Sequence, residues 1–173
     1  MTIEPLALFS IQFTFALIAY ALAARWYVVP RLRPLSPAAA LVPLVWVHVF
    51  RIVGGSILAP GSVGPSVPAE FREMVGYGDM VTAMLALGTL IAFRARWSRA
   101  IAFAWVFVAV ATLDTVNAII QSMRYSVFDD PLGVNWVIVT LYVPALLVST
   151  YLIVIELLLV RRTAGKTSER VGA

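Results

Sequence analysis

The apolar positions of the chain gather into five long runs, each interrupted by only a few polar residues. An α-helix rises about 1.5 Å per residue, so roughly 20 apolar residues span a hydrocarbon core about 30 Å thick. The runs lie at residues 5–28, 37–59, 69–93, 99–122 and 131–160. The pattern therefore predicts an all-α, polytopic integral membrane protein with five transmembrane helices.

Residues of the type that caps a helix precede three of these runs. Ser36 and Asp130 each stand directly before a proline, and proline is favoured at the first helical position because its missing N–H needs no partner there. Ser98 precedes the fourth run in a similar way. We expect these three side chains to be the N-caps of the second, fifth and fourth spans.

The composition leaves little room for anything besides the spans. Hydrophobic residues make up 61% of the chain and charged residues 13%, whereas soluble domains carry about 25% charged residues. We expect one transmembrane domain, residues 1–162, followed by a disordered cytoplasmic tail, residues 163–173. The first run is expected to remain as a span, because a secretory signal has its positive charge before the apolar run and here Glu4 stands there.

Positive charge is divided unevenly between the two sets of connections. If the runs alternate in direction, ten basic residues fall on one side and two on the other, and cytoplasmic loops carry the excess of Lys and Arg. The ten are Arg25, Arg31, Arg33, Arg94, Arg96, Arg99, Arg161, Arg162, Lys166 and Arg170, and the two are Arg72 and Arg124. This predicts an N-terminus outside and a C-terminus in the cytoplasm.

Polar residues inside the runs converge on one depth once the direction is assigned. Arg51, Asp79 and Asp114 fall at one level in the outer half of the membrane, and such charges normally face the bundle interior and pair. We expect Arg51 to bond Asp79, Asp114 or both, because its guanidinium presents five N–H donors. The full predicted site for a ligand or proton is Arg51, Asp79, Asp114, Asn117, His48, Tyr142 and Gln12.

One arginine and two aspartates give this layer a formal charge of −1. Either one aspartate holds a proton, as like charges at close range require, or a cation or cationic ligand enters from outside. The sequence leaves both alternatives open.

Two backbone features lie near the same layer. Pro144, in the middle of the fifth run, deprives the Thr140 carbonyl of its usual donor. Small residues in the second and third runs would let two backbones approach closely. These residues are Gly54, Gly55, Gly76 and Gly78.

The chemistry available to an enzyme is limited. There is no cysteine, the only histidine is His48, and the only lysine is Lys166 in the tail, which excludes thiolate chemistry, a bis-histidine haem site, an H-E-x-x-H zinc site and a Schiff base within the spans. We identify no catalytic residue, no metal ligand set and no cofactor.

One motif keeps an enzymatic alternative open. Residues 76–79, Gly-Tyr-Gly-Asp, fit the G-x-G-D pattern of intramembrane aspartyl proteases, and Asp114 supplies a second carboxylate. In those families, however, the other aspartate precedes this motif, whereas Asp114 follows it. The motif therefore indicates no family membership, and a membrane-embedded aspartyl-type or lipid-modifying enzyme ranks last among the hypotheses.

The leading hypothesis is a small integral membrane protein that binds or transports a small molecule, lipid or cation from the outer face, with a proton-linked Arg/Asp/Asn site. The alternative is an accessory or scaffold subunit of a larger membrane complex. The lipid bilayer is the expected partner in both, homo-oligomerisation is left open, and nucleic acid is not implied. The compact chain, with twelve arginines and one lysine, favours the cytoplasmic (inner) membrane of a bacterium.

Overall fold

The computed structural model describes residues 3–171, with side chains described up to Val160, and this part of the chain forms helices and turns without strands. Five helical segments are long and apolar enough to cross a membrane. They are Pro5–Leu32, Pro37–Leu58, Ala69–Arg94, Ala100–Arg124 and Val134–Val160. Each begins and ends within four residues of a predicted run, which confirms the all-helical class with five candidate spans.

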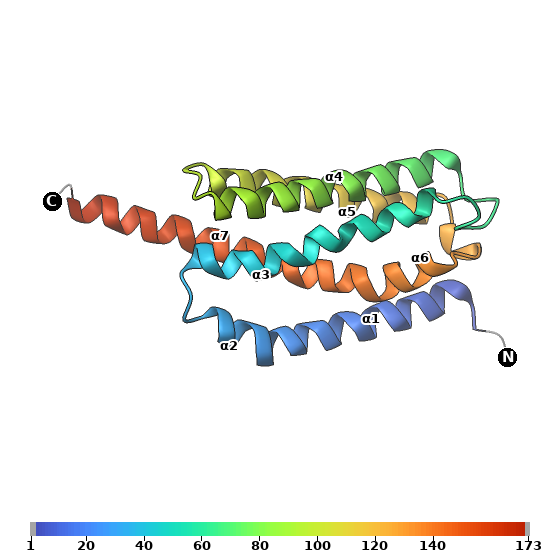
Figure 1. The fold of residues 1–173 in the computed structure, drawn as a ribbon. Coiled ribbons are helices and arrows are strands. Elements are labelled where there is room, and N and C mark those ends of the chain that lie inside the picture. Colours follow the sequence, from blue (N-terminus) through green and yellow to red (C-terminus); the bar gives the residue numbers. More distant parts are fainter. Residues whose placement is uncertain (1–2, 172–173) are drawn as a thin grey trace.

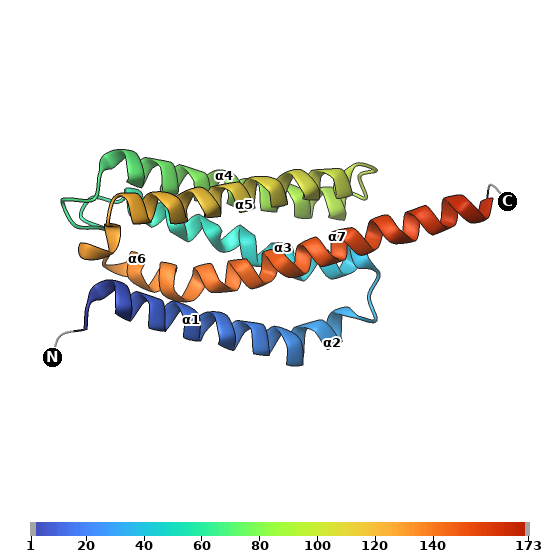
Figure 2. The same cartoon turned by 180° about the vertical axis from the view of Figure 1, so that it is seen from behind.

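The five segments lie side by side and alternate in direction (Figures 1 and 2). The first, α1 (Pro5–Ala23), is peripheral: it contacts the last span and has a single buried residue, Ala16. The centre is formed by α3 (Pro37–Val49), which contacts both α7 (Val143–Val171) and α4 (Ala69–Arg94). The α5 helix (Ala100–Arg124) packs along α4.

Two spans contain a π-helical turn shortly before a proline. The turn η1 (Ala24–Val28) precedes Pro30 of α2 (Val29–Leu32), and the turn η4 (Ile138–Tyr142) links α6 (Val134–Val137) to Pro144 of α7. Proline has no N–H to give to the preceding turn, and a π turn is one way a helix accommodates the break. The irregularity expected near Pro144 therefore takes the form of a widened turn.

The second span changes from α-helix to 3₁₀-helix in its C-terminal part. The 3₁₀ segment η2 (Phe50–Leu58) follows α3 directly. Because a 3₁₀-helix has three residues per turn, residues i and i+3 align on one face. The buried residues of this segment are Arg51, Gly54 and Ile57. Such a long 3₁₀ run is uncommon, and its contacts along α4 stabilise it.

Two apolar clusters fill the bundle, one on each side of Arg51 along the second span. The first cluster includes Leu44 of α3 and Phe107 of α5, and the second includes Ile57 of η2 and Phe71 of α4. The same order holds on α4, where Asp79 lies between Phe71 of the second cluster and Ala86 of the first. Arg51 and Asp79 therefore lie between two apolar clusters, one on each side along the helix axes.

The connection between η2 and α4 is held to the start of the last span. The carboxylate of Asp130 accepts hydrogen bonds from the backbone N–H of Ser66, at 3.0 Å, and from its hydroxyl. The last span begins only at Val134, after Gly133 with a φ of 51°. The prediction that Asp130 caps this span is therefore wrong, because its carboxylate is committed to the loop.

Of the other two predicted caps, one is confirmed. Ser36 Oγ accepts a hydrogen bond from the Ala39 N–H at 3.4 Å. Ser98 is not the N-cap of α5; Arg99 occupies that position and makes no side-chain cap hydrogen bond. Because α5 begins at Ala100, Ser98 lies one residue before the N-cap position.

The tail was predicted to be disordered from residue 163. In the structure the α7 backbone continues as a helix to Val171. Residues 172–173, and every side chain from residue 161 onward, lie outside the described part of the chain. Disorder of the tail therefore stays a prediction.

Replacing Ser36 with alanine tests the confirmed cap. Loss of an N-cap side chain costs about 0.5–2 kcal/mol, so Ser36→Ala should lower the free energy of unfolding by that amount. Ser98→Ala is the matched control and should stay within about 0.5 kcal/mol of wild type, as surface substitutions do. Denaturant unfolding in detergent micelles measures both, and equal effects of the two substitutions would contradict the assignment.

Candidate functional site

Arg51 lies between two aspartates that come from two other helices. Its Nε donates to Oδ1 of Asp79 on α4, and its Nη2 donates to Oδ2 of Asp114 on α5 at 2.6 Å. The Arg51 side chain is 5% exposed, whereas those of Asp79 and Asp114 are 15% and 14% exposed. The prediction that Arg51 bonds one or both aspartates is confirmed. We refer to Arg51, Asp79 and Asp114 as the triad.

The remaining guanidinium nitrogen bonds to α5 as well. Nη1 of Arg51 donates to the hydroxyl of Thr115 at 2.9 Å and to the Ala111 carbonyl at 3.3 Å. The Thr115 hydroxyl in turn donates to the Ala111 carbonyl at 2.8 Å. Sequence reasoning missed Thr115. Its position one residue after Asp114 and four after Ala111 was the available signal.

Two glycines provide the space that the carboxylates occupy. A methyl group at Gly54 would lie 1.7 Å from Oδ2 of Asp79, and one at Gly78 would lie 2.0 Å from Oδ1 of Asp114. Each aspartate therefore directs one oxygen at Arg51 and the other against a glycine. What these two glycines accommodate is a carboxylate side chain, whereas the close approach of two backbones that was expected at Gly54, Gly55, Gly76 and Gly78 stays a prediction.

His48 lies one turn before Arg51 and is almost completely buried, at 1% exposure. Its Nε2 is 3.4 Å from the hydroxyl of Thr150 on α7, and its ring meets Phe107 edge-on with centroids 5.2 Å apart. Among the described residues its Nδ1 has no hydrogen-bond partner. His48 therefore connects the second span to α5 and α7 rather than to the aspartates.

Tyr142 reaches the second span but not the carboxylates. Its hydroxyl donates to the backbone carbonyl of Val47, which lies four residues before Arg51. The bond fastens the π turn η4 to α3 close to the point where the α-helix becomes 3₁₀.

Asn117 and Gln12 make their hydrogen bonds away from Arg51. The amide of Asn117 donates to the Met74 sulfur at 3.0 Å, and Gln12 Oε1 accepts from the Trp136 indole N–H at 2.7 Å. Gln12 therefore links α1 to α6. The face of α5 that meets Arg51 carries Ala111, Asp114 and Thr115, so Asn117 points elsewhere.

The triad brings one guanidinium and two carboxylates together. In the described part of the chain, no three His, Asp or Glu side chains come together as a metal ligand set. Each carboxylate bonds the guanidinium, Asp79 through Nε and Asp114 through Nη2, whereas the two aspartates of an aspartyl protease share one proton directly.

Two grooves on the described surface lie away from the triad. One, of about 550 Å³, is lined by residues of α3 and α4 near the α4–α5 connection, and the other, of about 400 Å³, lies between the first span and α7. None of the triad residues lines either groove. The predicted access to Arg51 from the outer face stays a prediction.

A family model described as Domain of unknown function (DUF8737) matches residues 8–158 of the chain. The match includes all of the second, third and fourth spans and nearly all of the first and fifth. No curated protein and no solved structure matched the chain.

The glycine contacts predict unequal effects of two adjacent substitutions. Gly54→Ala forces a methyl group onto the Asp79 carboxylate and should lower the free energy of unfolding by about 1–3 kcal/mol, the usual cost of overpacking. At Gly55 a methyl group would lie 3.3 Å from the flexible Met80 side chain, so Gly55→Ala should be nearly neutral. Denaturant unfolding in detergent compares them, and equal stability of the two variants would refute the close approach.

The hydrogen bond from Arg51 predicts a similar contrast on α5. Thr115→Val removes an acceptor of a buried guanidinium and should cost about 1.5–3 kcal/mol, the range for hydrogen bonds to charged groups. Thr112, whose hydroxyl donates only to the Val108 carbonyl four residues earlier, is the matched control. If Thr112→Val destabilises the protein as much as Thr115→Val in the same unfolding assay, the hydrogen bond between Arg51 and Thr115 makes no specific contribution to stability.

Proposed function

The chain belongs to the DUF8737 family, and we propose that it is a small multi-pass membrane protein that binds or transports a solute through a proton-linked site at the triad. The observation that carries this proposal is one guanidinium shared by two carboxylates between two apolar clusters. Ionisable groups at such depth are expensive and are normally functional. In this proposal, a change in the protonation of an aspartate changes its pairing with Arg51.

The orientation we propose has the N-terminus outside and the C-terminus in the cytoplasm, in the inner membrane of a bacterium. The α2–α3 and α4–α5 connections lie at the same end of the bundle as the C-terminus (Figure 1). These connections carry Arg33, Arg96 and Arg99, and basic residues concentrate on the cytoplasmic side. In this orientation the triad lies in the outer half of the membrane.

The charge of the triad favours a proton over a larger cation. Its formal charge is −1, from one Arg51 and two aspartates. The oxygen of each aspartate that does not bond Arg51 lies against Gly54 or Gly78, and the backbone there takes up space that a solvated metal ion would need. A proton requires almost no volume, so protonation of one aspartate is the simplest way to neutralise the layer.

Protonation would also change which helices are tied together. Asp79 belongs to α4 and Asp114 to α5, and both are connected to the second span through Arg51. An aspartate that takes up a proton loses most of its attraction for the guanidinium. The position of the proton would therefore decide which aspartate stays paired with Arg51, while Thr115 and the Ala111 carbonyl keep α5 bonded to it. A proton on Asp79 would thus loosen α4 more than a proton on Asp114 would loosen α5, and such a change in helix contacts is what transport requires.

A role as an accessory subunit is the second candidate, and one feature of α5 favours it. Leu113 and Ile120 are 69% and 59% exposed, and Asn117 is exposed between them. A polar amide facing lipid is unfavourable, and a helix of a larger complex could cover it.

Neutralising the aspartates tests the proton-linked site. Infrared difference spectra between acidic and neutral pH should show a carboxylic acid band in wild type that Asp79→Asn or Asp114→Asn removes. Proton-driven flux into proteoliposomes should fall about tenfold or more in the same variants, because a charged hydrogen bond contributes about 1.5–3 kcal/mol. Asp129→Asn, at an exposed outer position, is the control and should behave as wild type.

The opposite results separate the alternatives. If both triad variants fold and match wild type in the spectra and the flux, the triad is structural and the proposed function is wrong. Absence of flux in wild type together with stable co-purification of another membrane protein would favour the accessory role.

A further inference from the structure

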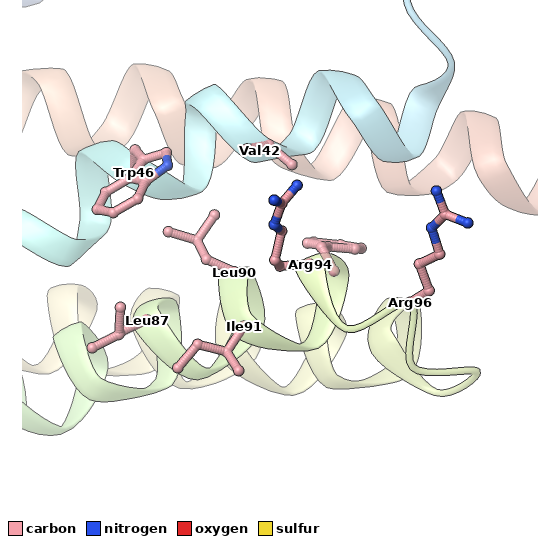
Figure 3. Close-up of a pocket in the computed structure, with 8 residues that line it drawn as sticks. Val42, Trp46, Leu87, Leu90, Ile91, Arg94 and Arg96 are labelled. Carbon is pink, nitrogen blue, oxygen red and sulfur yellow. The ribbon is translucent and has the colours of Figure 1, made fainter.

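The groove between α3 and α4 combines an apolar floor with two cationic side chains at one end (Figure 3). Its volume of about 550 Å³ lies within the range of about 300–1,000 Å³ that is usual for ligand sites. The floor is formed by Trp46 of α3 with Leu87 and Ile91 of α4, and Arg94 and Arg96 lie at the end of α4. The groove therefore offers an apolar surface and a positive entrance.

The two arginines are available to an anion. Both side chains are exposed, and the only salt bridges among the described side chains are those of Arg51. Figure 3 shows the Arg94 side chain extending from α4 toward Val42 of α3, with Arg96 farther along at the end of the groove. A negatively charged group at this end would meet two guanidinium groups without displacing a carboxylate.

The backbone at Arg96 supports a specific role for this side chain. The end of α4 is closed by hydrogen bonds from the Trp97 N–H to the Ala92 carbonyl, at 3.0 Å, and from the Arg96 N–H to the Phe93 carbonyl, at 3.1 Å. This pattern requires a left-handed residue, usually glycine, and Arg96 occupies the position with a φ of 52°. The backbone of Arg96 is strained at this φ, and its side chain places a second cation beside that of Arg94.

We propose that this groove binds an anionic phospholipid, with its phosphate on Arg94 and Arg96 and one acyl chain along Trp46, Leu87 and Ile91. Arg94 ends an apolar span, so its guanidinium lies at the depth of lipid phosphates, which guanidinium groups bind with paired N–H donors. Basic pockets between transmembrane helices bind anionic head groups in this way. In the proposed orientation this is the cytoplasmic leaflet.

The apolar part of the groove selects a lipid over a free phosphate. Trp46 is 47% exposed and Ile91 is 61% exposed, so the floor faces the hydrocarbon region rather than water. An acyl chain placed there covers apolar surface that a soluble phosphate would leave untouched. The site is also separate from the triad, because Asp79 and Arg94 are 15 residues apart on α4, or about 22 Å at 1.5 Å per residue.

Native mass spectrometry of the purified full-length chain in detergent tests the proposal. Phosphatidylglycerol should form a stable one-to-one complex, whereas phosphatidylcholine and glycerol phosphate should bind at least about tenfold more weakly, given the contribution of each basic residue to binding anionic lipid. The double variant Arg94→Gln/Arg96→Gln should lose this preference. Arg99→Gln removes the same charge from the same connection without lining the groove and should retain it.

A second variant tests the contribution of the apolar floor separately from that of the two arginines. Ile91→Trp fills the apolar floor while both arginines remain, and it should weaken phosphatidylglycerol binding without affecting folding, as judged by circular dichroism. The proposal is overturned if the double arginine variant binds phosphatidylglycerol as wild type does, if Arg99→Gln loses as much, or if Ile91→Trp binds normally. None of these measurements depends on the triad, so either proposal can fail without the other.

Discussion

The structure depends on one buried guanidinium that must be satisfied inside an apolar bundle. An unpaired charge at this depth costs several kcal/mol, and Arg51 avoids that cost by bonding to α4 and α5 with all three of its nitrogens. No single helix could supply these acceptors. The requirement therefore sets how the second, third and fourth spans lie against one another.

The local backbone follows from the same requirement. A continuous α-helix would place residues 51, 54 and 57 progressively out of line, because it has 3.6 residues per turn. The 3₁₀ segment aligns them, so that Arg51 bonds Asp79 while Gly54 leaves room for the second oxygen of that carboxylate. Gly78 does the same for Asp114, and any larger side chain at either position would collide with the carboxylate there.

The two ends of the bundle present different chemistry. The triad has a formal charge of −1 and lies between two apolar clusters, and its carboxylates keep a small exposed fraction. The groove at the end of α4 holds positive charge that no described carboxylate neutralises. We propose that the first region responds to protons and the second to anionic lipid, and α4 passes through both.

The sequence by itself determined the number and bounds of the spans and the common depth of Arg51, Asp79 and Asp114, because apolar length and distance from a span centre require no knowledge of packing. It did not determine how each helix is rotated. Asn117 was expected beside Arg51, but the face of α5 that meets Arg51 presents Thr115, and Asp130 was expected to cap a helix but binds Ser66. Rotation and loop contacts depend on neighbours distant in the chain, so only the tertiary structure decided them.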